Sequence, residues 1–460
     1  MVMSASGVFV RLFRKVLPSP FAIALILSAI SLVLAMVFGT FESGVPSWKG
    51  TLISWERGLW NPGLLVFAYQ MMLILVLGHV VVLSKPFEIL IGGITKWVTN
   101  GASAAGLVAI VTMLVAFFNW GLGLVFGAIL ARKVGEYASQ NNIPINYPLI
   151  GACGYLGLLV FNGGISGSAA LKASEPGHLT DLMRPSTAQD LMQFVPNRIP
   201  TADTIFHPSN LVVSVLLLLI LGGFAYWLGK RTPTTKFELP EFSTRDLDQK
   251  ILQGAEKLDH SPGLALGFGM VLLAGFFLQY LPELKLLNLT PNMLNLFMLA
   301  LGVLLHGNIY RFQRAVSHAI SGASGILIQF PLYFGIMGVM SGSGLIGAIS
   351  DYFVSIADAD SYPFFTFLSA GLVNIFIPSG GGQWAVQGPV IMQAALQLNV
   401  PLSKALMALA YGDQLTNMMQ PFWALPLLGI TRLKASDILP YSLLFMLVGG
   451  LIFVLGLFFW

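Results

Sequence analysis

The sequence reads Pro378-Ser379-Gly380-Gly381-Gly382-Gln383-Trp384 in the middle of an apolar run that covers residues 362–398. A single helix needs only about 20 residues to cross a bilayer, so this run is too long for one straight crossing. Proline and three consecutive glycines cannot continue a helix at that point. We therefore predict a helical hairpin that enters the membrane and turns back at this motif.

The turn of such a hairpin is a candidate binding site. Non-helical backbone has N–H and C=O groups that hydrocarbon cannot satisfy, so it is tolerated only inside protein or beside a wet cavity. A glycine-rich packing kink would give the same pattern in a single motif. However, a second apolar run at 103–133 is also broken near its centre, at Asn119, Trp120 and Gly121. Two such motifs favour two re-entrant hairpins that take part in a common site.

The composition indicates the class of protein. Hydrophobic residues make up 56% and charged residues 10% of the 460 residues, whereas a soluble domain has roughly 25% charged residues. We therefore predict an all-α polytopic membrane protein. The net charge of +4 is attributed to Lys and Arg on the cytoplasmic side, and no nucleic-acid partner is expected. Cys153 is the single cysteine, which excludes an intramolecular disulfide and a cysteine-based metal site.

Apolar runs long enough to cross a bilayer predict about nine spans besides the two hairpins. They lie at 20–41, 62–83, 147–171, 209–229, 263–282, 290–307, 320–341, 402–430 and 440–460. Two of these spans, 147–171 and 402–430, are predicted to be broken. Amphipathic pieces at 84–98 and 344–356 suit helices that lie at the membrane interface.

The chain divides into two similar halves. We predict a first repeat at 1–229, a cytoplasmic linker with a connecting span at 230–289, and a second repeat at 290–460. Phe118–Gly123 in the first half corresponds to 377–382 in the second, at an offset of roughly 260 residues. Four crossings per repeat and one connecting span place the second repeat upside down. Inverted repeats with paired broken helices are typical of secondary transporters whose site lies near the midplane.

The placement of Lys and Arg supports this topology. With the N-terminus in the cytoplasm and both hairpins returning to the side they entered from, 17 of the 24 basic residues lie in cytoplasmic segments and 7 lie outside. This excess has the direction that the positive-inside rule requires. A full crossing by either hairpin would reverse every later loop and remove the bias.

Polar residues at the breaks form the predicted substrate site. Helix N-termini present unpaired N–H groups and a partial positive charge, so convergent breaks can hold a small carboxylate without an arginine. Alternatively, these polar side chains only satisfy one another across helices. The predicted substrate-binding residues are Asn119, Trp120, Gly121, Asn162, Gly163, Ser379, Gly380, Gly381, Trp384 and Asn417.

Asp413 is the ionisable residue that we place within a broken span. A carboxylate in that position is costly unless it has a partner or a function. Burial disfavours its charged form, so it could carry a proton, or it could share a sodium ion with backbone carbonyls. We predict that Asp413 and Thr416 couple a cation to the substrate; the alternative is that Asp413 only accepts hydrogen bonds from the broken backbone. No cofactor and no firm metal site are predicted.

These motifs resemble those of a known family. The strings Phe118–Gly123, Pro378–Trp384, Gln387-Gly388-Pro389 and Gln420–Pro426 are similar to those of bacterial short-chain fatty acid transporters of the acetoacetate and butyrate uptake type. The resemblance covers nearly the whole chain and implies an inner-membrane carrier of short fatty acid anions. That family is in turn similar to dicarboxylate carriers of the ion-transporter superfamily, which have two hairpins, a scaffold domain and usually a dimeric assembly. The resemblance also implies Glu or Asp at the position of Asp413.

We therefore predict a secondary active transporter that imports butyrate or acetoacetate, coupled to protons or sodium, by elevator-like alternating access. The expected partners are this substrate, the cation, the bilayer and a second copy of the chain. Two alternatives stay open: a cation/proton antiporter, which would exchange ions without an organic anion, and a passive carboxylate channel, which would not accumulate its substrate. The sequence shows no catalytic triad, phosphate loop or metal cluster, so no enzyme activity is predicted.

Overall fold

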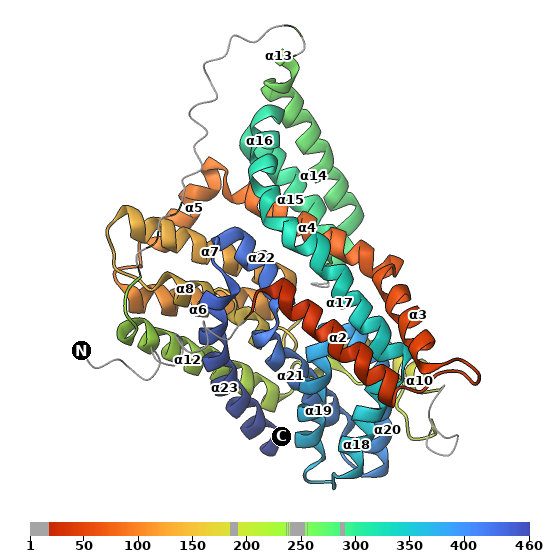
Figure 1. Ribbon diagram of the computed structural model, residues 1–460. Coiled ribbons are helices and arrows are strands. Elements are labelled where there is room, and N and C mark those ends of the chain that lie inside the picture. Colours follow the sequence, from red (N-terminus) through yellow and green to blue (C-terminus); the bar gives the residue numbers. More distant parts are fainter. Residues whose placement is uncertain are drawn as a thin grey trace.

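The computed structural model describes residues 18–184, 192–235, 237, 239, 254, 256–285 and 290–460. Within these ranges every regular element is a helix (Figure 1). The prediction of an all-α membrane protein is thereby confirmed. Most of the predicted linker at 230–262, and the segment before the first span, lie outside the described residues.

The first half contains the helices from α2 to α12. Several of the long ones begin at a proline whose preceding side chain caps the helix, as Ser19 does for α2 and Asn61 for α4. The elements are α2 (Pro20–Phe38), α3 (Ser47–Leu59), α4 (Pro62–Val82), α5 (Lys85–Thr95), α6 (Gly101–Phe118), α7 (Trp120–Gln140), α8 (Tyr147–Cys153), η1 (Leu156–Leu159), α9 (Ser168–Ser174), α10 (His178–Met183), η2 (Thr201–Asp203) and α12 (Pro208–Arg231).

The second half follows the connecting helix α14. Its elements, with α13 and α14, are α13 (Glu256–Asp259), α14 (Pro262–Lys285), α15 (Pro291–His306), α16 (Ile309–Ala319), η4 (Ile320–Ala323), α17 (Ser324–Gly342), α18 (Leu345–Ser355), α19 (Tyr362–Phe376), α20 (Gly380–Gln397), α21 (Leu402–Thr416), η5 (Asn417–Met419), α22 (Pro421–Thr431) and α23 (Ala435–Phe458).

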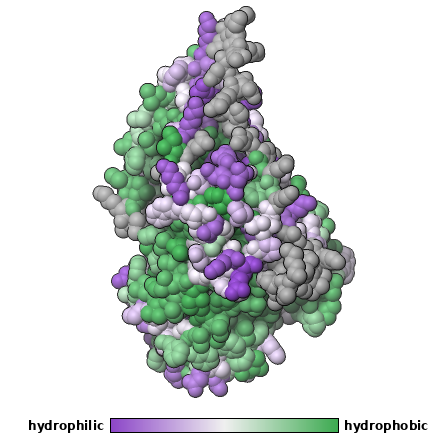
Figure 2. Space-filling model, turned by 90° about the vertical axis from the view of Figure 1, so that its left-hand side faces the viewer, coloured by the Kyte–Doolittle hydropathy of each residue, from purple (hydrophilic) through white to green (hydrophobic). Residues whose placement is uncertain are grey.

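Six described helices are long and apolar enough to cross a membrane, namely α2, α4, α6, α12, α14 and α23. A seventh is added if α17 and α18, which meet at an angle of 60°, count as one bent span. Helix α15 and the helices of the two broken spans are shorter apolar pieces, so the number of nine crossings stays a prediction. Broad apolar areas lie on the face drawn in Figure 2, as a surface in contact with lipid requires.

The helices are interrupted at both predicted hairpin turns, near Asn119 and near Pro378. Only Asn119 separates α6 from α7, and 377–379 separate α19 from α20. The run at 147–171 consists of α8, η1, an irregular stretch at 160–167 and α9, while the run at 402–430 consists of α21, η5 and α22. All of these breaks belong to one group of helices.

Corresponding helices of the two halves pack in exchanged pairs. Helix α2 packs on α17 of the second half, while α15 of the second half packs on α4. In the same way α3 contacts α17 and α16 contacts α4. This group of helices contains none of the central breaks, and in Figure 1 its members α15 and α16, together with the neighbouring α14, rise away from α6, α12 and α23.

Candidate substrate and cation site

The irregular stretch after η1 connects the centres of the two halves. Asn162 Nδ2 donates to Asp413 Oδ2 (2.5 Å) and to the Ala410 carbonyl (3.3 Å). The Asn162 N–H donates to Gln414 Oε1 (2.9 Å), and Asn162 Oδ1 accepts from the Ser168 N–H (3.1 Å). Asn162 is fully buried, and its side-chain amide and its backbone N–H are all hydrogen-bonded. The first broken span is thus bonded directly to the second.

The tip of the first hairpin lies against the same irregular stretch. The Trp120 N–H donates to Ser166 Oγ (2.9 Å). Asn119 Oδ1 accepts from the Leu122 N–H (2.8 Å) and so caps α7. The Trp120 ring lies 5.4 Å from that of Trp423 in α22, with an interplanar angle of 73°. Trp120 therefore contacts both broken spans, through Ser166 and through Trp423.

The tip of the second hairpin reaches the Asp413 carboxylate. Ser379 Oγ accepts from the Gly382 N–H (3.2 Å) and caps α20, as Asn119 caps α7 in the first half. A methyl group added at Gly380 would lie 3.1 Å from Asp413 Oδ2. By contrast, a methyl group added at Gly381 would meet no described atom within 4 Å, and this residue is exposed. At the tip, Gly380 thus lies against the Asp413 carboxylate, whereas Gly381 faces open space.

Asn374 organises the second break, although it was not among the predicted site residues. Its Nδ2 lies within hydrogen-bonding distance of the Asp413 carbonyl (2.7 Å), Thr416 Oγ1 (2.9 Å) and Asn417 Oδ1 (2.8 Å). Gln420 Nε2 donates to the Asn374 carbonyl (2.6 Å). The available signal was an asparagine inside an apolar helix, just before the break. Asn374 therefore holds together two predicted site residues, Thr416 and Asn417.

Acceptor oxygens exceed donors around Asp413. Its side chain is fully buried, Oδ1 has no hydrogen-bond partner among the described residues, and no ion pair found among them includes it. Asn374 Oδ1 and Gln420 Oε1 are also buried without a donor in the described part of the chain. A buried charge without a partner is costly. The arrangement suits a proton on Asp413 or a cation bound beside it.

Trp384 and Gly163 have their polar groups bound elsewhere. Trp384 Nε1 donates to His178 Nε2 in α10 (3.1 Å), and the indole is 1% exposed. The Gly163 carbonyl accepts from Asn210 Nδ2 in α12 (2.8 Å). Gly121 lies next to Leu294 of α15, because a methyl group added to it would be 3.6 Å from Leu294 Cδ1. These three residues lie around the hairpin tips. Gly380, Asn162 and Asp413, by contrast, lie next to one another.

Two tyrosines link their own half to the break of the other half, Tyr155 directly and Tyr411 through Asn210. Tyr155 Oη, in the first half, lies 2.9 Å from both the Asn417 and the Gln420 carbonyl oxygens. Tyr411 Oη, in the second half, donates to Asn210 Oδ1 (2.7 Å), and the same Asn210 holds the Gly163 carbonyl. We refer to these contacts as the tyrosine cross-brace. It fixes each irregular backbone against the other half.

We expect Tyr411→Phe to lower the stability of the folded protein by roughly 1 kcal/mol, because buried Asn210 Oδ1 loses its donor. Thermal unfolding of the purified protein should show a lower midpoint. Tyr226→Phe removes a hydroxyl from an exposed ring and is the matched control. Equal midpoints for both variants would mean that the cross-brace does not hold the break.

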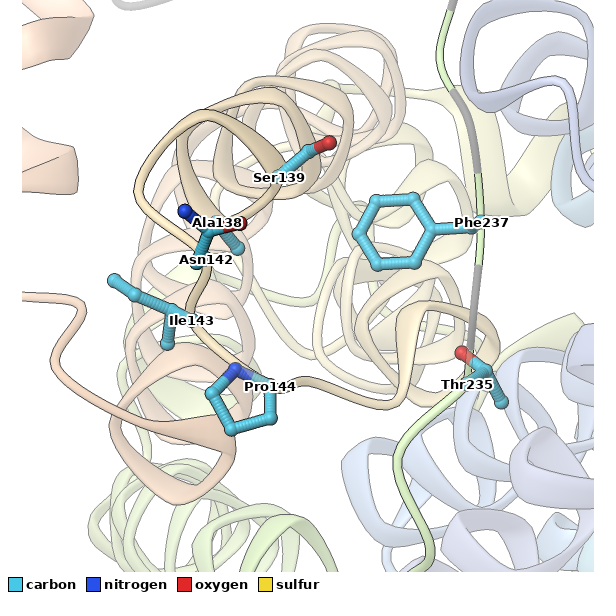
Figure 3. A pocket seen from close by; sticks show the side chains of 7 residues that line it. All are labelled: Ala138, Ser139, Asn142, Ile143, Pro144, Thr235 and Phe237. Carbon is cyan, nitrogen blue, oxygen red and sulfur yellow. The ribbon is translucent and has the colours of Figure 1, made fainter.

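A hollow in the surface lies away from these breaks. It has a volume of about 630 Å³ and is bordered by the loop after α7 together with Thr235 and Phe237 (Figure 3). Phe237 stacks on Tyr147, with 4.6 Å between ring centroids. No charged side chain is among its lining residues. Because this hollow borders none of the breaks and has no basic side chain in its lining, we do not assign it to the substrate.

Comparison with known proteins identifies the family. A family model described as "Short chain fatty acid transporter" matches residues 1–460. The chain belongs to this short-chain fatty acid transporter family. The family resemblance found in the sequence motifs is therefore confirmed, and the family is one of transporters.

Members of the family from two bacteria are similar over the full length. A protein of Escherichia coli (strain K12) is 36% identical over 469 residues, which cover 99% of each chain. A protein of Haemophilus influenzae is 34% identical over 468 residues, which cover 100% of each chain. Both are named for short-chain fatty acid transport.

One solved structure is also similar. It is the crystal structure of the Alcanivorax borkumensis YdaH transporter, whose title reports an unusual topology. The two chains are 16% identical, the match covers 96% of this chain and 97% of the other, and the TM-score is 0.40. A likeness at this level bears on neither the site nor the topology.

Proposed function

We propose that this family member imports short-chain fatty acid anions, such as butyrate and acetoacetate, by cation-coupled secondary transport across the bacterial cytoplasmic membrane. The observation that carries the proposal is the buried Asp413 carboxylate, which lies against the tip of the second hairpin and has one oxygen without a donor among the described residues. A passive channel has no need for such a group. Its cost is offset only when a cation or proton is present.

The substrate carboxylate is assigned to the start of α20. Gly380 and Gly381 place the first N–H groups of an 18-residue helix at the tip, where the helix dipole favours an anion, and the N–H of Gly382 is bonded to Ser379 Oγ. The open space beside Gly381 allows close approach to the backbone. A cation bound at Asp413 would offset the negative charge of the Asp413 carboxylate and the substrate carboxylate. Substrate and cation would then favour each other's binding through direct charge attraction.

The helices that carry the breaks are assigned to a moving body. They are α6 to α12 and α19 to α23, and the exchanged pairs formed by α2, α3, α4, α15, α16 and α17 are the scaffold against which they slide. The exchange of partners is what two inverted repeats produce. Helices α4 and α7 approach closely, since a methyl group added at Gly78 would lie 2.6 Å from Val125 Cγ1. We place the N-terminus in the cytoplasm and expect a homodimer through the scaffold.

Uptake into proteoliposomes tests the function directly. Labelled butyrate and acetoacetate should accumulate above the external concentration when an inward proton or sodium gradient is imposed, and should not accumulate without one. Ion exchange without any organic anion would favour the cation/proton antiporter instead. Equilibration that never exceeds the external concentration would favour the channel.

We expect cysteines at positions 259 and 355 to react with impermeant reagents from opposite sides of the membrane. Asp259 in α13 is predicted to be cytoplasmic and Ser355 at the end of α18 to be outside, and both are exposed. The background is Cys153→Ser, since Cys153 is buried. Asp259→Cys should label only in inside-out vesicles and Ser355→Cys only in intact cells. Labelling of both from one side would rule out the inverted topology.

A further inference from the structure

An apolar cavity lies between the proposed moving body and the scaffold. Its volume is about 400 Å³, and helices α4, α5, α7, α14 and α15 supply its walls. Every residue that borders it is apolar, and Leu122 and Phe277, which are 37% and 46% exposed, show that it opens towards lipid. Leu122 stands in the first turn of α7, directly after the first hairpin tip. The cavity therefore extends from the bilayer to the proposed transport machinery.

The cavity is larger than the substrate's own short chain would need. An apolar cavity of about 150 Å³ already holds benzene. At about 400 Å³ this one lies in the range of roughly 300–1,000 Å³ that larger ligands occupy. Because it contains no polar group to orient a carboxylate, it suits a long hydrocarbon chain whose head lies outside.

An exposed lysine lies in the chain between two residues that line the cavity. Lys85 is exposed at the start of α5, between the lining residues Val82 and Phe87. None of the described side chains forms an ion pair with it. Helix α5 has the length and mixed character of an interfacial helix, and Trp97, just after it, is 74% exposed. Lys85 thus lies where the head group of an anionic lipid would be.

We propose that this cavity binds one acyl chain of an anionic phospholipid, with its phosphate head group at Lys85. The chain fills the space between α7 and the helices α4, α14 and α15, and contacts the first turns of the helix that begins at the hairpin tip. Attraction to Lys85 selects an anionic head over a zwitterionic one. The site is separate from Asp413 and does not depend on which substrate is carried.

Native mass spectrometry of the delipidated, full-length protein tests this site. We expect it to retain one dioleoyl phosphatidylglycerol per chain at a concentration at which dioleoyl phosphatidylcholine is not retained. Lys85→Gln should weaken phosphatidylglycerol binding about fivefold, the effect expected for one basic residue near an anionic surface. Met298→Trp and the milder Leu301→Phe should weaken it at least tenfold by occupying the chain's space.

Two control variants match these changes. Lys96→Gln removes the exposed basic residue just after α5. Leu216→Trp narrows a second cavity of about 420 Å³ between α12 and α23, where no basic residue is among the lining residues. Both controls should bind phosphatidylglycerol as the unmodified protein does. Thermal unfolding identifies any cavity-filling variant that fails to fold. If Met298→Trp fails to fold, the test of the site rests on Leu301→Phe and Lys85→Gln.

Three results would overturn the proposal. The first is equal retention of phosphatidylcholine and phosphatidylglycerol, and the second is unchanged binding in the Lys85 and cavity variants. The third is displacement of phosphatidylglycerol by oleate at equal concentration, which would assign the cavity to a free fatty acid. Because the readout is lipid binding, none of these results depends on the outcome of the uptake assay.

Discussion

Asp413→Asn is expected to abolish uphill uptake of butyrate and acetoacetate while exchange of labelled for unlabelled substrate continues. The amide keeps the shape of the side chain, and its oxygen can still accept from Asn162 Nδ2, but it can bind neither a proton nor a cation as a carboxylate does. An anion that moves inward alone is opposed by about 2.3 kcal/mol per 100 mV of inside-negative potential. Without coupling, the internal concentration should fall to roughly one-fiftieth of the external one at 100 mV.

Time courses of labelled butyrate in proteoliposomes with a set potential measure this ratio. Asp351→Asn makes the same change at an exposed carboxylate in α18 and should leave accumulation unchanged. If Asp413→Asn still concentrates butyrate with the same dependence on pH and sodium, then the coupling ion binds elsewhere. The backbone carbonyls at the two breaks would be the next candidates.

Gly381→Val is expected to reduce uptake by at least a factor of ten without reducing the amount or stability of the protein. A methyl group at this position meets no described atom, so valine does not clash with the protein itself. It does occupy the open space at the start of α20 where the substrate carboxylate must approach the backbone. Initial rates of uptake and thermal unfolding of the same preparation measure the two effects separately.

Gly275→Val is the matched control, since Gly275 in α14 also has open space around it but lies far along the chain from any break. It should transport normally. Gly380→Val makes a useful contrast, because its side chain would press on Asp413 Oδ2 and should lower stability as well as uptake. Normal transport by Gly381→Val would mean that the glycine tip is only a packing kink.

The interruptions of the helices could be predicted from the sequence because they follow from local chemistry. Three glycines after a proline cannot extend α19, and Asn119 and Ser379 are residue types that commonly cap the start of a helix, as each does here. Asp413 was also identifiable, since a lone carboxylate in an apolar run is rare. These properties belong to single segments, and so the sequence alone reveals them.

The partners of these residues could not be predicted, because they depend on how each helix is rotated about its axis. Asn374 lies in an apolar helix and turns inward to Asp413, Thr416 and Asn417, whereas the same residue type on another face would contact lipid. We expected Trp384 near the substrate, and its N–H is bonded to His178, which is 206 residues earlier in the chain. Contacts over such separations leave no local pattern.

The tyrosine cross-brace has a consequence for how the protein is made. Tyr155 leaves the ribosome 262 residues before the Asn417 carbonyl that it will bond. At about 5–20 residues per second, that interval is roughly 10 to 50 seconds. During this time the first half stands in the membrane with its irregular stretch and its tyrosine unmatched, which hydrocarbon tolerates poorly. The centre of the molecule is therefore completed only after translation of its last helices.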